Sequence, residues 1–177
     1  MTFPQPIGTL SVSHSLRLGS VKGPASKLKM AGNRVSYTLD STLESVNTAE
    51  ATAEQMATKA GFGEDERHLI SMAVREAAVN AVLHGNAYDP GKKVRIAFEN
   101  TADSLVITIA DEGKGLSPDK IPDPLAPENL LKQSGRGIFL IKSFMDEVRF
   151  RPLEPGTEIT LVKHVRGHAA HSTEGRK

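Results

Sequence analysis

The pattern of hydrophobic and polar positions predicts one long helix in the middle of the chain, over residues 64–85, whose second half is mostly apolar. Its second half, residues 72–85, reads MAVREAAVNAVLHG and has no internal glycine or proline. Glu76, Asn80 and His84 are spaced i, i+4 and i+8, so they form one row among alanines, valines and a leucine. A helix that is apolar nearly all round is usually buried, and its polar side chains need partners. The row is therefore either a set of hydrogen bonds at the edge of the core or a site.

The same patterning places the other elements. Five segments alternate with period two, as strands do: residues 34–41, 92–98, 104–110, 147–151 and 157–164. A helix capped by Ser41 or Thr42 is predicted to end before Gly61, and a third helix covers residues 138–145. The order is strand, two helices, two strands, a long proline-rich segment, then a helix and two strands. This order has no internal repeat and indicates one domain over residues 34–164.

The two ends of the chain differ from this domain. Residues 1–34 hold five basic residues and no acidic one, and residues 1–33 show no sustained period. We expect residues 1–33 to be a disordered basic extension and residues 165–177 to be a flexible basic tail. The basic residues lie among glycine, serine and proline without interleaved aromatics, so direct nucleic-acid binding is not expected.

Composition excludes several kinds of chemistry. The chain has no cysteine, so it can form no disulfide, zinc–thiolate site or thiol nucleophile. It contains no apolar run of the roughly 20 residues that a membrane span requires, and its start lacks the apolar region of a signal peptide. We therefore expect a soluble, cytoplasmic protein that does not bind a membrane.

A first glycine motif follows the strand 104–110. Glycines at positions 113 and 115 let the backbone approach a ligand closely, and Asp111 at the strand end can accept a hydrogen bond from an exocyclic amine such as that of adenine. The motif alone is also common in ordinary turns. Residues 116–134, with four prolines, form a loop long enough to suggest a lid over a site.

A second glycine motif precedes the helix predicted over 138–145. The backbone N–H groups of Gly135 and Gly137 could hold a phosphate at the start of that helix, and Arg136 could add charge. Glycines before helices are common, so this motif is weak by itself. The chain has no Walker A motif, no protein-kinase H-R-D or D-F-G motif, no Rossmann unit around its glycines and no nucleophile elbow.

The combination is far more specific than its parts. Glu-x-x-x-Asn-x-x-x-His-Gly, then Asp-x-Gly-x-Gly, a proline-rich lid and Gly-x-Gly on a helix resemble the GHKL ATP-binding fold. That superfamily includes gyrase and MutL ATPase domains, Hsp90 and sensor histidine kinases. The segments REAAVNAVLHGN, GRGIFLIKSFMDEV and GTEITLVK are similar to bacterial anti-sigma-factor serine kinases of the RsbW type. The resemblance covers about residues 35–164.

This resemblance implies an α/β (α+β) two-layer sandwich, with a mixed, mainly antiparallel sheet, helices on one face, and ATP and Mg²⁺ as ligands. Glu76 would be the general base toward the attacking hydroxyl. Asn80 would coordinate Mg²⁺ through its amide oxygen, a hard ligand of the kind that this ion favours. His84 and the adjacent Gly85 would lie near the phosphates.

The glycine motifs would bind the rest of the nucleotide. Asp111 would read the adenine amine with help from Thr157, while Gly113 and Gly115 would make room for the nucleotide. Gly135 and Gly137 would form the hinge of the lid and, with Arg136, hold phosphates. Phosphoryl transfer depends mainly on positioning and charge neutralisation, so this set is sufficient for it.

The function implied is that of an ATP-dependent anti-sigma factor. It would bind a sigma factor and phosphorylate a serine of a STAS-type anti-anti-sigma protein; a homodimer is a further expectation from the family. One alternative is a non-catalytic module that holds ATP and sequesters a partner, which is favoured by Gln133 standing where some relatives have a basic residue. The other is a stand-alone histidine-kinase-like ATPase domain, which is disfavoured because no dimerisation helix pair with a phospho-accepting histidine precedes it.

Overall fold

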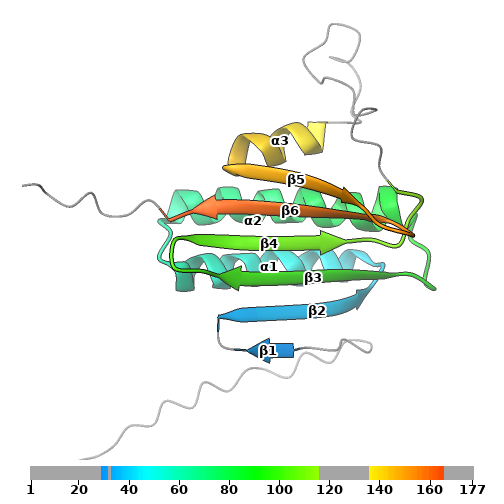
Figure 1. Ribbon diagram of the computed structural model, residues 1–177, viewed down its shortest axis with the longest axis horizontal. Coiled ribbons are helices and arrows are strands. Elements are labelled where there is room, and N and C mark those ends of the chain that lie inside the picture. The colour runs from blue at the N-terminus through cyan, green and yellow to red at the C-terminus, as the bar shows by residue number, and fades with distance from the viewer. Residues whose placement is uncertain (1–28, 32, 116–135, 166–177) are drawn as a thin grey trace, which may run out of the picture.

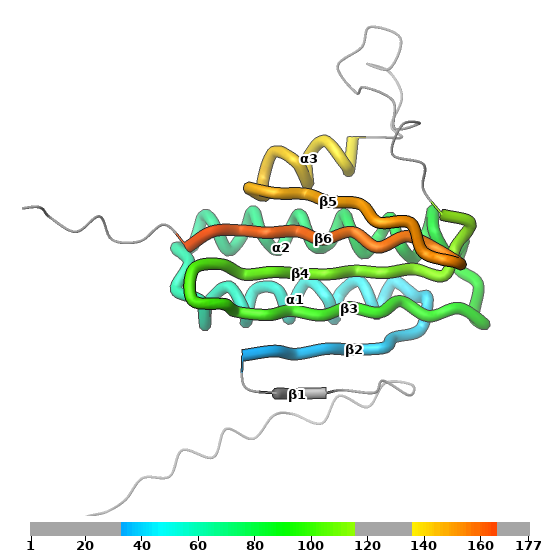
Figure 2. Tube along the Cα trace, in the orientation of Figure 1, coloured from blue at the N-terminus to red at the C-terminus, as the bar shows by residue number. Residues whose placement is uncertain are grey.

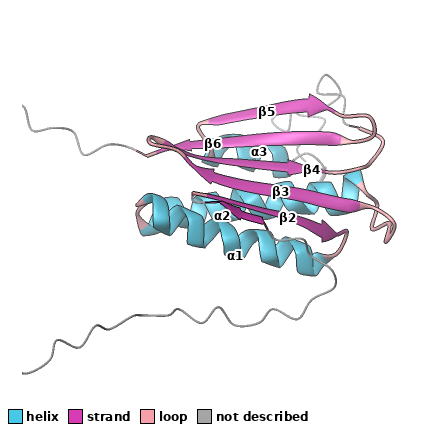
Figure 3. Cartoon of the chain, turned by 60° about the horizontal axis from the view of Figure 1, so that its bottom comes forward, coloured by secondary structure: helices cyan, strands magenta, loops and turns pink. Residues whose placement is uncertain are grey.

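The computed structural model describes residues 29–31, 33–115 and 136–165. Within these residues, six strands form one sheet in the order β1-β2-β3-β4-β6-β5, and three helices pack on one face of it (Figures 1 and 3). The strands are β1 (Lys29–Ala31), β2 (Arg34–Asp40), β3 (Lys93–Asn100), β4 (Ser104–Ala110), β5 (Glu147–Pro152) and β6 (Thr157–His164). The helices are α1 (Leu43–Ala60), α2 (Glu64–Val79), which continues into the turn η1 (Asn80–Gly85), and α3 (Arg136–Phe144). The predicted two-layer sandwich is confirmed.

Every strand pairing in the described sheet is antiparallel, where the sequence suggested a mixed, mainly antiparallel sheet. The reason lies in the connections (Figure 2). A single crossover helix between neighbouring strands would make them parallel. Here two consecutive helices, α1 and α2, separate β2 from β3, so the chain re-enters the sheet from the end at which β2 left it.

The strand register aligns the apolar faces of four strands. Phe98 of β3 lies between Val35 of β2 and Ile107 of β4. Ile107 in turn lies beside Leu161 of β6, and all four side chains are buried. Because alternate residues point to the same face, this register places a continuous apolar surface under the helices. It explains why the period-two segments of the sequence predicted the strands well.

The ends of α1 follow ordinary capping chemistry. The Thr42 hydroxyl oxygen accepts a hydrogen bond from the Ser45 backbone N–H, and Gly61 ends the helix with φ of 87°. Both ends were predicted from the sequence. The short strand β1, paired with β2, was not: it lies within the segment expected to be disordered. Residues 1–28 of that segment, the predicted lid over 116–134 and the tail over 166–177 lie outside the described residues.

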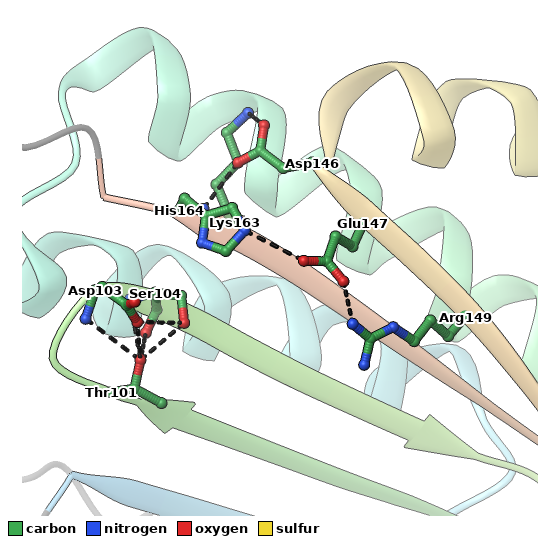
Figure 4. A network of polar contacts seen from close by, with 8 residues as sticks. All are labelled: Thr101, Asp103, Ser104, Asp146, Glu147, Arg149, Lys163 and His164. Carbon is green, nitrogen blue, oxygen red and sulfur yellow. Dashed lines mark hydrogen bonds and ion pairs between the residues drawn. The ribbon is translucent and has the colours of Figure 1, made fainter.

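A polar network at one end of the sheet fastens α3 to β6 (Figure 4). The Lys163 ammonium donates to the carbonyl of Phe144, the last residue of α3, at 3.0 Å and to the Asp146 carboxylate at 3.2 Å. The other Asp146 oxygen accepts the His164 backbone N–H at 2.8 Å. Burial tends to raise the pKa of Asp146, but these two donors outweigh it and hold that pKa below its usual value. Thr101, in the β3–β4 hairpin at the same end, bonds to Ser104.

None of the helices in the described ranges is long and apolar enough to cross a lipid bilayer.

We predict that Asp146→Asn lowers the free energy of unfolding by about 1 kcal/mol at neutral pH, because it weakens two charge-assisted hydrogen bonds at a partly exposed site. The folded-state pKa is below the unfolded one, so the carboxylate stabilises fully above its ordinary pKa of 3.8 and loses this effect as the pH falls through the folded value. The difference between variant and parent, measured by urea denaturation, should therefore shrink on acidification. Glu147→Gln, which removes only exposed ion pairs, is the control; an equal effect there would contradict the assignment.

Candidate functional site

The predicted central helix changes its geometry just where the polar row lies. The α-helix ends at Val79, and the next six residues form the π-helical turn η1, in which the Asn86 N–H donates to the Ala81 carbonyl at 2.8 Å. The prediction of one α-helix as far as Gly85 is therefore wrong in its last turn. Such wider turns occur frequently at functional sites, because they re-aim side chains. His84 lies on this turn and is exposed.

Two members of the row, Glu76 and Asn80, meet the start of α3. A Cβ atom placed on Gly137 would lie 2.8 Å from the Glu76 carboxylate oxygen Oε2. It would also lie 3.6 Å from Asn80 Nδ2 and 3.7 Å from Asn80 Oδ1. The absence of a side chain at Gly137 thus lets the first turn of α3 rest against both polar groups. Three residues predicted from two separate motifs come together here.

Glu76, near the end of α2, and Asn80, at the start of η1, are half-buried beside the buried alanines of these two elements. Within the described part of the chain, neither side chain makes a hydrogen bond or an ion pair. Polar groups in such surroundings usually have partners, so these two are available to a ligand. A carboxylate can accept a proton, and an amide oxygen is a hard ligand of the kind that Mg²⁺ takes together with phosphate oxygens. The donor set therefore fits a magnesium–nucleotide complex.

Asp111 lies directly after β4 and is 7% exposed. Its Oδ1 atom accepts the Gly113 backbone N–H at 2.8 Å, and its own N–H donates to the carbonyl of Thr157, the first residue of β6, at 3.0 Å. Burial raises the pKa of Asp111, although the backbone N–H groups of Gly113 and Thr157 oppose the shift. A buried carboxylate of this kind is a strong and specific acceptor for a donor that can reach it.

Glycines surround Asp111 so closely that no side chain fits at three positions. A Cβ on Gly85 would lie 2.5 Å from the Asp111 carboxyl carbon, and a Cβ on Gly113 would lie 2.1 Å from the Gly85 carbonyl oxygen. A Cβ on Gly156, whose φ is 111°, would lie 2.0 Å from the Asp111 carbonyl oxygen. Backbone thus packs on backbone around the carboxylate. We call Gly85, Gly113, Gly156 and Asp111 the glycine socket.

The two clusters are linked along the chain by η1, which begins at Asn80 and ends at Gly85. Gly115, also a predicted site residue, has φ of 83° and is exposed. Arg136 is exposed at the first position of α3. Gly135, the remaining member of the second glycine motif, lies outside the described residues.

Two residues of this region were not predicted as site residues. Gly156 precedes Thr157 in the segment GTEITLVK, and its positive φ and lack of space for a side chain could have been suspected only from that adjacency. Asn86 directly follows Gly85 and is completely buried. An asparagine after a helix-ending glycine usually indicates a turn, so its burial had no clear signal in the sequence.

The geometry agrees with what comparison with known proteins shows. Residues 39–163 match the histidine kinase-like ATPase domain. The serine-protein kinase RsbW of Bacillus subtilis (strain 168) is 31% identical over 130 residues, which cover 70% of this chain and 81% of that protein. The anti-sigma F factor of Anoxybacillus flavithermus is 36% identical over 106 residues, covering 57% of this chain and 71% of that protein.

A solved structure shares the fold. The crystal structure of the RsbU and RsbW domains of Rv1364c from Mycobacterium tuberculosis superposes with a TM-score of 0.52 at 22% identity, covering 76% of this chain and 33% of that longer chain. The match of the family over most of the described fold, the RsbW relatives and the placement of the motif residues agree. The chain therefore belongs to the histidine kinase-like ATPase domain family and is of the RsbW type.

Proposed function

We propose that this chain is an ATP-dependent anti-sigma factor that phosphorylates a serine of a STAS-type anti-anti-sigma protein. One observation carries the proposal: Glu76 and Asn80, without partners in the described part of the chain, face the first turn of α3 at Gly137. A purely structural role would pair such groups with their neighbours. The relatives named serine-protein kinase and anti-sigma factor support the same function.

The glycine socket would bind the base of ATP. The Asp111 carboxylate accepts a hydrogen bond from the exocyclic amine of adenine, a donor that guanine and hypoxanthine lack at that position. Because Gly85 and Gly113 carry no side chain, no Cβ atom stands between the backbone there and a flat base that approaches the carboxylate. Thr157, buried beside Asp111, adds a hydroxyl at the same place.

Glu76 would act on the phosphate end. Asn80 would hold Mg²⁺ through its amide oxygen, and the bound ion would neutralise phosphate charge. The hydroxyl oxygen of the partner's serine forms a bond to the γ-phosphorus, and the bond from that phosphorus to the oxygen bridging to the β-phosphate breaks. ADP leaves with the electron pair of that bond, and Glu76 takes the hydroxyl proton. The products are ADP and a phosphoserine.

The phosphate would change which partner is bound. A phosphoserine carries about −1.5 to −2 charge at neutral pH, which repels nearby carboxylates and is costly to bury. We propose that phosphorylation releases the antagonist and leaves the chain free to hold a sigma factor. Because sigma factors work with RNA polymerase, this function implies the cytoplasm. A homodimer is part of the proposal by family resemblance and contributes nothing to the chemistry above.

We predict that Glu76→Gln abolishes phosphate transfer while ATP still binds. General-base catalysis typically contributes about 10²–10⁴-fold in rate, and the amide keeps the size of the carboxylate without accepting a proton. Transfer is measured from γ-labelled ATP and Mg²⁺ to STAS-domain proteins encoded in the same genome, and binding by calorimetry. Label on a partner serine that persists in the variant would contradict the role of Glu76. ATP binding by the parent with no labelled partner would instead favour a sequestering module without catalysis.

We also predict that Gly137→Ala impairs transfer more than stability. Alanine is the better helix former by about 0.5–1 kcal/mol. Its Cβ, however, would lie 2.8 Å from Glu76 Oε2, so the carboxylate must move. We expect at least about a tenfold loss of transfer rate, equivalent to 1.4 kcal/mol, with an unchanged or higher melting temperature. Gly63→Ala, where the Cβ meets no atom within 4 Å, is the matched control and should leave the rate unchanged. Equal rates in both variants would exclude a close role for α3.

A further inference from the structure

Asn86 is the most deeply buried polar residue of the region, and nothing in the chemistry proposed above uses it. It is 0% exposed and directly follows Gly85 of the glycine socket. Its side-chain Nδ2 donates to the Lys93 carbonyl at 3.0 Å, and its Oδ1 accepts the Glu112 backbone N–H at 2.8 Å. One carboxamide thus joins the end of η1 to the start of β3 and to the residue after Asp111.

Glu112 closes this arrangement into a ring. Its Oε2 atom accepts the Lys93 backbone N–H at 3.0 Å. Asn86 therefore bonds to Lys93, Lys93 to Glu112, and Glu112 back to Asn86. We call Asn86, Lys93 and Glu112 the three-residue ring. The second Glu112 oxygen pairs with Arg95 at 3.1 Å, which fixes the carboxylate from its other side.

The three-residue ring lies just beyond the end of the β3–β4 pairing. The β3–β4 pairing ends with Arg95 opposite Ala110, so Asp111 and Glu112 lie beyond the last paired residues of these two strands. Asp111 does have a backbone bond to Thr157 of β6 on its other side. On the β3 side, the side-chain hydrogen bonds of the three-residue ring take the place of the backbone hydrogen bonds that a longer β3–β4 pairing would make. It fixes the position of the segment from which the Asp111 carboxylate projects.

The turn after Asn86 shows that this position is imposed on the backbone. Ala87 and Tyr88 both have positive φ, 54° and 57°, and the Asp89 N–H donates to the Asn86 carbonyl at 3.0 Å. These are the features of a type I′ turn, which usually contains glycine or asparagine at its central positions. Two side-chain-bearing residues in this conformation cost free energy and persist only where the surroundings hold them. Here the Tyr88 N–H donates to the Val82 carbonyl at 3.0 Å, and the buried carboxamide of Asn86 anchors the first residue of the turn.

We propose that Asn86 is a positioning residue for base selectivity: through the three-residue ring it sets where the Asp111 carboxylate lies and hence how strongly the protein prefers a 6-amino purine. This rests on the proposed binding of ATP by Asp111. Asn86 itself touches no ligand in this scheme. Its loss should therefore weaken binding of the purine that donates to Asp111 and spare binding of a purine that does not.

The test compares ATP with inosine triphosphate, which carries an oxygen in place of the 6-amino group, by calorimetry in the presence of Mg²⁺. We expect the parent to bind ATP at least about tenfold more tightly, the worth of one well-placed hydrogen bond to a charged group. In Asn86→Ala the dissociation constant for ATP should rise about tenfold and that for inosine triphosphate about twofold or less, so the preference is lost. Glu112→Ala, at a partly exposed position, should also reduce the preference for ATP over inosine triphosphate. If Asn86→Ala does not fold, the result with Glu112→Ala alone tests the inference.

Asn100→Ala is the matched control. Like Asn86, Asn100 is an asparagine whose Nδ2 donates to a backbone carbonyl, that of Met56 at 3.1 Å. It is the last residue of β3, at the opposite end of that strand from Lys93. It should lower the melting temperature and keep the preference for ATP. A preference retained in both Asn86→Ala and Glu112→Ala would overturn the inference while leaving ATP recognition intact. A parent that binds both nucleotides equally would overturn base reading by Asp111 itself, and the inference with it.

Discussion

Direct contact of backbone with backbone around Asp111 is the constraint on which the site depends. Gly85, Gly113 and Gly156 come from the end of η1, the turn after β4 and the turn before β6, and none of them has room for a Cβ atom. Three segments distant in the sequence can therefore meet at Asp111, with Gly85 against its carboxylate and Gly156 against its backbone carbonyl. The same contact removes water from that carboxylate, which raises its pKa and makes it a selective acceptor.

The part of the site around Glu76 and Asn80 depends on a different element, α3. Its last turn is fastened to β6 through Lys163. Its first turn rests on Glu76 of α2 and Asn80 of η1, neither of which has a side-chain partner within the described residues. Helix α2 itself is held by its apolar residues, which pack in the core and leave Glu76 and Asn80 at the edge of it. The Glu76 carboxylate is thus positioned by packing and keeps its hydrogen-bonding capacity for the role proposed above. The same helix can therefore pack into the core and still present polar groups at the edge of it.

The sequence was informative where one local rule decides the outcome. Strand alternation, the Thr42 cap and the glycine at position 61 gave most element boundaries, and the motif spacing gave the residues that meet at the site. The π-helical turn could not be predicted, because nothing in the amino-acid sequence from Asn80 to Gly85 distinguishes it from a continued α-helix. The burial of Asn86 could not be predicted either. Its two side-chain partners, Lys93 and Glu112, are brought together by the pairing of β3 with β4, which is not a local feature of the sequence around Asn86.

The most direct test of this account is a titration of the Asp111 carboxyl carbon by NMR, with and without saturating ATP and with Asp111→Asn for assignment. Burial should raise the pKa of the free protein's Asp111 above the ordinary 3.8. Because the adenine amine donates to the ionised carboxylate, ATP should lower that pKa, as linkage requires. An ordinary pKa in the free protein, or one that ATP leaves unchanged while it binds, would contradict the claim that this carboxylate reads the base.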